Sequence, residues 1–174
     1  MADRLPHPDL VAAIPRLRRY ARVLTGEASR ADDLVQDTLA RAWEKRALWQ
    51  AGTDLRAWLF TVMHNVFVNQ RALAMRDARN VSLDADQVAV DLWQLAVRPS
   101  QHAHVELGEV LREMMRLPQE QREVLVLAAV EEMKYEEIAS VLDIPIGTVM
   151  SRLSRARDKL RRIVSEPVPL KVVR

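Results

Sequence analysis

The chain has 174 residues, of which 49% are hydrophobic, and its 26 basic and 24 acidic residues leave a formal net charge of +2 at pH 7. Because it contains no cysteine and only four scattered histidines, its composition excludes disulfides and cysteine-based zinc sites, and we expect neither a metal nor a cofactor. It shows no signal peptide and no apolar run near the ~20 residues that span a bilayer, so we expect a cytoplasmic protein without membrane insertion.

The first 80 residues show the apolar spacing of three successive helices. The first covers residues 10–24 and ends before Gly26, a residue type that suits a helix C-terminus. The second covers residues 29–48. The third begins at Leu55 and is apolar on two faces, so it must be covered on both, by other helices or by a bound partner. We predict that residues 8–80 form one small helical domain.

After residue 80 the periodicity fades, and it returns near residue 105. Residues 81–104 contain three aspartates with no basic residue before Arg98, and we predict a flexible acidic linker there. Helical spacing then resumes in residues 105–166, with a break at Pro118, and residues 167–174 form a tail. Glycine is scarce while Ala, Leu, Arg and Glu recur, so we predict an all-α fold of two small helical domains.

The end of the second domain has the layout of a helix-turn-helix. A helix over Tyr135–Leu142 is followed by a short turn and a basic helix from about Ile146 to Val164. Val149, Leu153 and Ala156 share one face of the basic helix and should pack inward.

The opposite face of that helix combines small residues with arginines, which suits close approach to DNA. Arg155 can form a bidentate pair with guanine, the serines can pair with base edges, and Met150 can meet a thymine methyl group. The alternative is an amphipathic helix whose charges are merely solvated. The predicted DNA contacts are Thr148, Met150, Ser151, Arg152, Ser154, Arg155, Arg157 and Lys159.

Five short motifs carry a resemblance to a known family. Three lie in the second domain: Leu117–Leu125 (LPQEQREVL), Tyr135–Ala139 (YEEIA) and Gly147–Arg157 (GTVMSRLSRAR). Two lie in the first domain: Asp32–Trp43 (DDLVQDTLARAW) and Arg56–Asn65 (RAWLFTVMHN). The first set resembles region four, and the second set region two, of sigma factors of the extracytoplasmic-function (ECF) class, which are promoter-reading subunits of bacterial RNA polymerase. Two motif sets in the right order are more specific than a helix-turn-helix alone.

This resemblance implies that the second domain reads the −35 element of a promoter while the first docks on polymerase and opens the −10 element. Asp33, Gln36 and Asp37 match the positions that bind the clamp helices of the largest polymerase subunit. The alternative for these carboxylates is that they only favour a helix N-terminus. The linker would thread the polymerase or serve as a simple tether. An anti-sigma factor is the further partner that the resemblance implies.

The −10 contacts implied by the resemblance are Trp49, Val62, Asn65 and Asn69. They fit the physics of opening, because a base that leaves its stack can be held by an aromatic ring and by edge hydrogen bonds. Trp43 and Trp58, by contrast, are expected in the core. Asn69 stands where aspartate is frequent and Met150 where lysine or arginine is frequent, so the promoter preference of relatives cannot be transferred.

Two other functions compete with a promoter-reading subunit. One is a sigma-like decoy that titrates an anti-sigma factor, and the other is a dimeric helix-turn-helix repressor, which leaves the first domain without a purpose. An enzyme is disfavoured, because the sequence has no phosphate-binding glycine loop, metal-ligand spacing or nucleophile and base motif.

Overall fold

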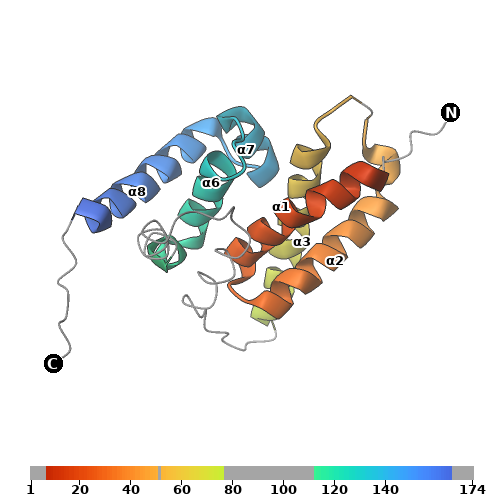
Figure 1. Cartoon of the computed structure of the whole chain (residues 1–174), viewed down its shortest axis with the longest axis horizontal. Coiled ribbons are helices and arrows are strands. Elements are labelled where there is room, and N and C mark those ends of the chain that lie inside the picture. Colours follow the sequence, from red (N-terminus) through yellow and green to blue (C-terminus); the bar gives the residue numbers. More distant parts are fainter. Residues whose placement is uncertain (1–6, 51, 77–111, 166–174) are drawn as a thin grey trace, which may run out of the picture.

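The computed structural model of the chain describes residues 7–50, 52–76 and 112–165 (Figure 1). Every regular element within these ranges is a helix. The predicted all-α fold class is therefore confirmed. The predicted linker at 81–104 and the tail at 167–174 lie outside the described residues, so the domain boundaries stay predictions.

The N-terminal domain consists of α1 (His7–Thr25), α2 (Ala28–Glu44) and α3 (Leu55–Arg76), which pack pairwise on one another. α1 ends where Gly26 takes a φ of +72°, a backbone conformation that glycine adopts without a steric cost. A short 3-10 helix, η1 (Arg46–Leu48), follows α2. The largest fully buried apolar side chains of this domain are Leu17, Tyr20, Leu34, Leu59, Phe60 and Met63.

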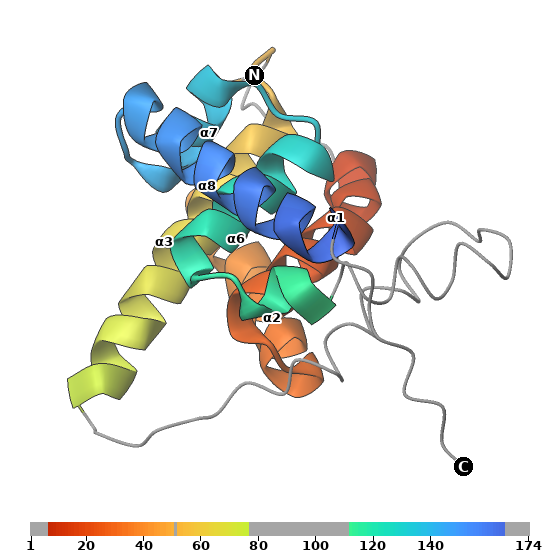
Figure 2. The ribbon, with the colours of Figure 1, turned by 90° about the vertical axis from the view of Figure 1, so that its left-hand side faces the viewer.

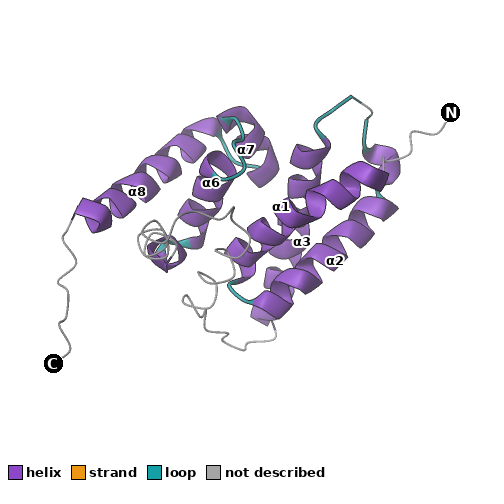
Figure 3. Cartoon of the chain, viewed as in Figure 1, coloured by secondary structure: helices purple, strands orange, loops and turns teal. Residues whose placement is uncertain are grey.

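The C-terminal domain contains α6 (Gln119–Ala129), α7 (Tyr135–Leu142) and α8 (Ile146–Ser165), and residues 112–116 before them are also helical. The turn between α7 and α8 begins at Asp143, whose φ is +51°, a conformation that aspartate tolerates better than most residues. Leu127, Ile138 and Leu153 form the centre of the domain. α7 and α8 are thus the predicted helix-turn-helix, with short loops between the helices (Figure 3).

The two domains pack against each other. α1 lies against α6 and α3 against α7, and the two ribbon views agree on this arrangement (Figures 1 and 2). The buried apolar residues of both domains form one cluster. We call the contact of α1 and α3 with α6 and α7 the junction. α3 is therefore covered both by its own domain and by the other one, as its two apolar faces require.

One core prediction in the N-terminal domain is wrong. Trp43 is 52% exposed, and its ring lies under the guanidinium group of Arg46, 5.2 Å from the ring centre. Trp58, the other tryptophan predicted for the core, is half-buried and packs against the buried core residues. Trp43 lies at the end of α2, where the helix gives way to η1 and no further turn covers the ring.

Candidate nucleic-acid interface

Helix α8 separates an apolar face from a basic one. Val149, Leu153 and Ala156 are buried, at the spacing of four and three that the sequence predicted. The backbone N–H groups of Thr148 and Val149 donate to the carbonyl oxygen of Pro145 at 2.8 and 3.2 Å, so the helix begins directly after the turn. Packing on α6 and α7 fixes the orientation of the opposite, basic face.

Most of the residues predicted to contact −35 DNA share the solvent-facing side of α8. Thr148 and Arg152 are half-buried. Six basic side chains and one acidic side chain lie between residues 150 and 162, which gives the helix a strong positive potential. The exposed members of the predicted set are Met150, Ser151, Ser154, Arg155, Arg157 and Lys159.

Arg152 differs from the other arginines of α8, because it is bound within the protein. Its side chain is 22% exposed, and Nη2 lies 2.7 Å from Oε2 of Glu120 at the start of α6. This ion pair joins α8 to α6, one of the helices on which it packs. Arg152 is therefore placed to orient α8, and it can reach a phosphate only if it leaves Glu120.

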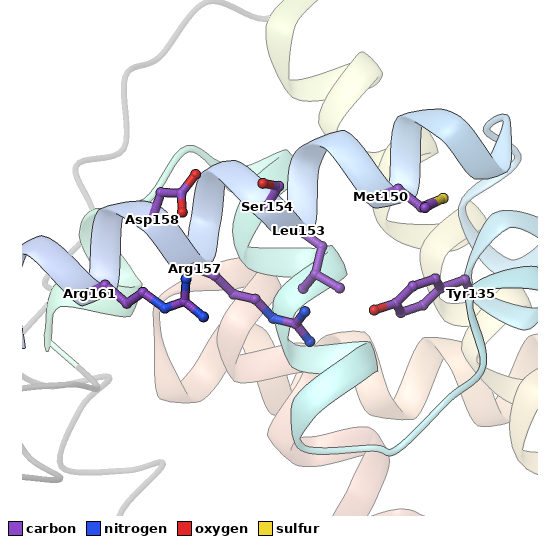
Figure 4. Close-up of a pocket in the computed structure, with 7 residues that line it drawn as sticks. All are labelled: Tyr135, Met150, Leu153, Ser154, Arg157, Asp158 and Arg161. Atoms are coloured by element: carbon purple, nitrogen blue, oxygen red, sulfur yellow. The ribbon is translucent and has the colours of Figure 1, made fainter.

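A shallow pocket of about 270 Å³ lies along one flank of α8, next to the first residue of α7 (Figure 4). Figure 4 shows Tyr135 beside Met150 at one end, while two arginine side chains extend from the other end. The apolar end can accept a base methyl group, and the arginines of the other end, where Asp158 also lies, can contact a phosphate. The lining residues are Tyr135, Met150, Leu153, Ser154, Arg157, Asp158 and Arg161.

The four residues predicted for −10 DNA lie on α3 and in the loop before it. Asn65 and Asn69 are exposed and four residues apart, so their amides share one face of α3. Val62 is only 7% exposed and offers a base little surface. Trp49 is half-buried, and its indole Nε1 is buried without a hydrogen-bond partner. A buried N–H group without an acceptor is unfavourable, and a rearrangement of the loop that exposes this group to an acceptor would remove the cost.

The predicted polymerase-docking residues lie on the outer side of α2. Asp33, Gln36 and Asp37 are all exposed. Asp37 accepts a hydrogen bond of 2.7 Å from Nε2 of Gln70 on α3. Helix α2 lies on the side of the N-terminal domain that faces away from α6, α7 and α8 (Figures 1 and 2). The junction therefore leaves this surface accessible.

Sequence reasoning missed a polar network inside the junction. Glu131, which follows α6, has a fully buried side chain, and its Oε1 accepts bonds of 3.3 and 3.1 Å from Nε and Nη2 of Arg19. Nη1 of Arg16 lies 3.6 Å from the other oxygen, Oε2. Nη1 of Arg56 donates to the backbone carbonyl of Glu131 at 2.8 Å. The available signal was the pair of arginines three residues apart on α1.

A second polar contact crosses the junction at Glu123 of α6. Its Oε2 lies 3.8 Å from Nδ1 of His64 on α3, and its Oε1 accepts a 2.6 Å bond from Gln119. Burial raises the pKa of the Glu123 carboxyl and lowers the pKa of the His64 imidazole, because each charged form loses water. Both groups are therefore biased toward the neutral state.

No cluster of three or more His, Cys, Asp or Glu residues that could hold a metal ion occurs in residues 7–50, 52–76 and 112–165. Among the helices described there, none is long and apolar enough to cross a membrane.

Comparison with known proteins matches both domains. The family model of the sigma2 domain of PhyR matches residues 10–64, and that of region 4 of sigma-70 matches residues 107–160. Over 156 residues the chain is 40% identical to the ECF RNA polymerase sigma factor EcfG of Rhodopseudomonas palustris (strain TIE-1). That alignment covers 90% of this chain and 83% of EcfG.

Solved structures share the arrangement of helices. The sigma factor RpoE of Bartonella quintana, solved in complex with the anti-sigma factor NepR, matches with a TM-score of 0.73 and 30% identity. The match covers 92% of this chain and 97% of that one. The complex of the anti-anti-sigma factor PhyR with NepR from the same organism matches with a TM-score of 0.56 and 15% identity, over 90% of this chain and 49% of that one. At that identity the likeness concerns the fold alone.

Proposed function

Because this chain belongs to the ECF family of RNA polymerase sigma factors, we propose that it binds core RNA polymerase and directs initiation at promoters with a −35 and a −10 element. The observation that carries this proposal is the exposed basic face of α8, held on a helix-turn-helix in the same chain as a second, sigma-type domain. As a polymerase subunit the protein acts in the cytoplasm.

In this proposal α8 enters the major groove of the −35 element. Arg155 lies near the centre of the exposed face and pairs with a guanine, while Ser151 and Ser154 bond to neighbouring base edges. Arg157 and Lys159 contact phosphates on the two flanks, and these contacts fix the register without reading sequence. Met150 lies at the apolar end of the pocket and meets a thymine methyl group. Thr148 contributes at the helix start.

The N-terminal domain captures the opened −10 element. Asn65 and Asn69 read an unstacked base from the exposed face of α3, and Trp49 in the preceding loop supplies a stacking surface. Val62 supports this face from within the core. Asp33, Gln36 and Asp37 dock α2 on the clamp helices of the largest polymerase subunit. Their charge and amide groups pair with a polar helical surface there.

Control by an anti-sigma factor is part of the proposal. It is supported by the solved complex of the similar sigma factor RpoE with the anti-sigma factor NepR. A protein of that kind would withhold the chain from polymerase until a signal removes it.

The test is run-off transcription by core polymerase on a pool of genomic fragments, with and without the purified chain. We expect specific transcripts only when the chain is present. Arg155→Ala should lower −35 affinity by ~1–3 kcal/mol, and Asn65→Ala should impair opening more than duplex binding. Arg116→Ala is a matched control, because this exposed arginine pairs with Glu113 and lies outside the proposed contacts. Normal transcription by both Arg155→Ala and Asn65→Ala would refute the proposed roles of these two residues.

A second candidate function is the decoy, and the match of residues 10–64 to the sigma2 domain of PhyR favours it. A decoy binds an anti-sigma factor but starts no transcripts. The same run-off assay separates the two functions, because a decoy leaves the transcripts of core polymerase unchanged at any concentration.

A further inference from the structure

Arg152 is anchored at the edge of the buried stripe of α8. It comes three residues after Val149 and four before Ala156, both of which are buried, so the three share one side of the helix. Its Nη2 lies 2.7 Å from Oε2 of Glu120, and only 22% of the side chain is exposed. Arg155, one turn further along α8, is exposed. The charge of Arg152 is therefore directed into the domain, unlike the charge of its neighbour.

Two acidic residues of α6 attract this arginine. Glu120 lies in the first turn of α6, where its negative charge also favours the positive end of the helix dipole. Glu123 follows three residues later, on the same side of the helix. Burial raises the pKa of the Glu123 carboxyl, and the positive charge of Arg152 opposes this rise, so these two groups attract each other. A phosphate would have to draw Arg152 away from both acids.

The ion pair constrains α8 in a way that its apolar packing does not. Val149, Leu153 and Ala156 are held by hydrophobic burial, which has no directional preference, so this packing tolerates a small roll of the helix about its axis. A charge-assisted hydrogen bond, by contrast, fixes the distance and the angle between two particular groups. The pair of Arg152 with Glu120 therefore selects one rotation of α8 on α6.

A small roll of α8 is enough to disturb its contacts with bases. Because a helix with its side chains is about 10–12 Å in diameter, a roll of ~20° moves the atoms at its surface by about 2 Å. The lengths of N–H···O hydrogen bonds in proteins span only ~0.5 Å. Such a roll would take Arg155 and Ser151 out of register with base edges, whereas a long, flexible side chain such as Lys159 can still follow a phosphate.

We infer that Arg152 and Glu120 are positioning residues for −35 recognition: their ion pair fixes the rotation of α8, and neither residue contacts DNA. This inference rests on the proposed function, since it assumes that α8 reads a −35 element. It gives Arg152 a different role from the DNA contact that the sequence predicted. The preference for a −35 sequence then depends on an acidic residue outside α8, although removal of a negative charge ordinarily strengthens binding to DNA.

The test measures affinity and salt dependence on two DNA duplexes. Core polymerase loaded with the chain is titrated onto a duplex that carries the −35 sequence of a promoter found by run-off transcription, and onto a duplex with that sequence scrambled. Arg152→Ala should lower the ratio of the two affinities about tenfold, a loss typical of one misplaced base contact. It should leave the salt dependence of binding unchanged, because no phosphate contact is lost.

Lys159→Ala is the matched control for a phosphate contact. Lys159 is exposed and comes seven residues after Arg152, on the same side of α8. Its removal should weaken binding to both duplexes alike, so the ratio of affinities stays the same. It should also reduce the slope of log affinity against log salt concentration by ~0.9.

Glu120→Gln separates the two roles of Arg152 by the sign of its effect. If Arg152 positions α8, this variant should lower the ratio of affinities about tenfold, as Arg152→Ala does. If Arg152 contacts a phosphate for which Glu120 competes, the variant should bind both duplexes more tightly, with a slope steeper by ~0.9. Glu132→Gln removes the same charge from another exposed position of the domain and should leave the ratio unchanged.

Two results would overturn the positioning role while leaving the proposed function intact. One is an unchanged ratio of affinities in Arg152→Ala, and the other is tighter binding of both duplexes by Glu120→Gln. If the parent itself shows no preference for the −35 duplex, the proposed function fails and the inference falls with it. Thermal unfolding followed by circular dichroism checks that each variant is folded, since a largely exposed partner such as Glu120 adds little to stability.

Discussion

Replacing Glu132 by glycine should stabilise the protein. Glu132 has a φ of +54°, in the left-handed region where a side chain clashes with its own backbone. The backbone N–H of Met133 donates to the carbonyl oxygen of Leu127 at 3.0 Å, which closes a wide turn around Glu132 at the end of α6. Glycine is the preferred residue at this position of the turn. The Glu132 side chain is exposed, so removing it forfeits no core packing.

The expected gain follows from two opposing terms. Relief of the left-handed conformation is worth ~1–2 kcal/mol. The greater freedom of glycine in the unfolded chain takes back about 0.5–1 kcal/mol. The net gain in the free energy of unfolding is therefore roughly 0–1.5 kcal/mol, with a midpoint of about 0.75 kcal/mol, and this midpoint corresponds to a rise in Tm of about 2–3 °C for a chain of this size.

Urea unfolding followed by circular dichroism measures this difference, with Glu132→Gln as the control. Glutamine keeps the side chain and the strained backbone but removes the charge, so we expect it to leave the free energy of unfolding unchanged. An equal gain in both variants would mean that charge and not backbone conformation is responsible. A loss of stability in Glu132→Gly would refute the reasoning altogether.

Three further predictions follow from the site and the core. Burial lowers the pKa of His64 below its usual 6.5, so as the pH falls through that value the unfolded chain takes up the proton first and stability declines. His64→Gln should flatten this decline in urea unfolding between about pH 7.5 and 5.5. The readout is the difference in stability between the variant and the parent at each pH. This difference is needed because the raised pKa of Glu123 increases stability as the pH falls further, which opposes the effect of His64. Asp33→Lys should weaken binding to core polymerase roughly tenfold in a fluorescence titration. Asp9→Lys, at an exposed position of α1, should leave this affinity unchanged. Equal effects of the two substitutions would contradict the proposal that α2 docks on polymerase. Leu153→Ala, at a buried position of α8, should lower the free energy of unfolding by ~2–5 kcal/mol, and a smaller loss would mean that the α8 core can collapse around the gap.

The helices and the family were predictable from the sequence because their signals are local. Val149, Leu153 and Ala156 repeat at helical spacing, and the structure buries all three as predicted. The ECF resemblance rested on short contiguous motifs, and the comparisons confirm it. The roles of individual residues toward DNA and polymerase stay predictions.

The junction was not predictable, because its contacts join residues that are far apart in the chain. Arg19 and Glu131 are separated by 112 positions, and nothing in the neighbouring residues marks Glu131 as buried. Charged residues next to one another usually stay in water, and Glu132 beside it does so. Arg152 illustrates the same limit, since its pairing with Glu120 depends on how α6 and α8 cross.

Helix α3 contacts the C-terminal domain with one side and exposes polar residues to solvent on the opposite side. Arg56, His64 and Arg71 reach across to the C-terminal domain, whereas Asn65 and Asn69 face solvent. A substitution on the first side alters the contact between the two domains, whereas under the proposed function we expect one on the second side to alter promoter preference. If both expectations hold, domain packing and promoter selectivity can be adjusted separately, by different mutations within a single helix.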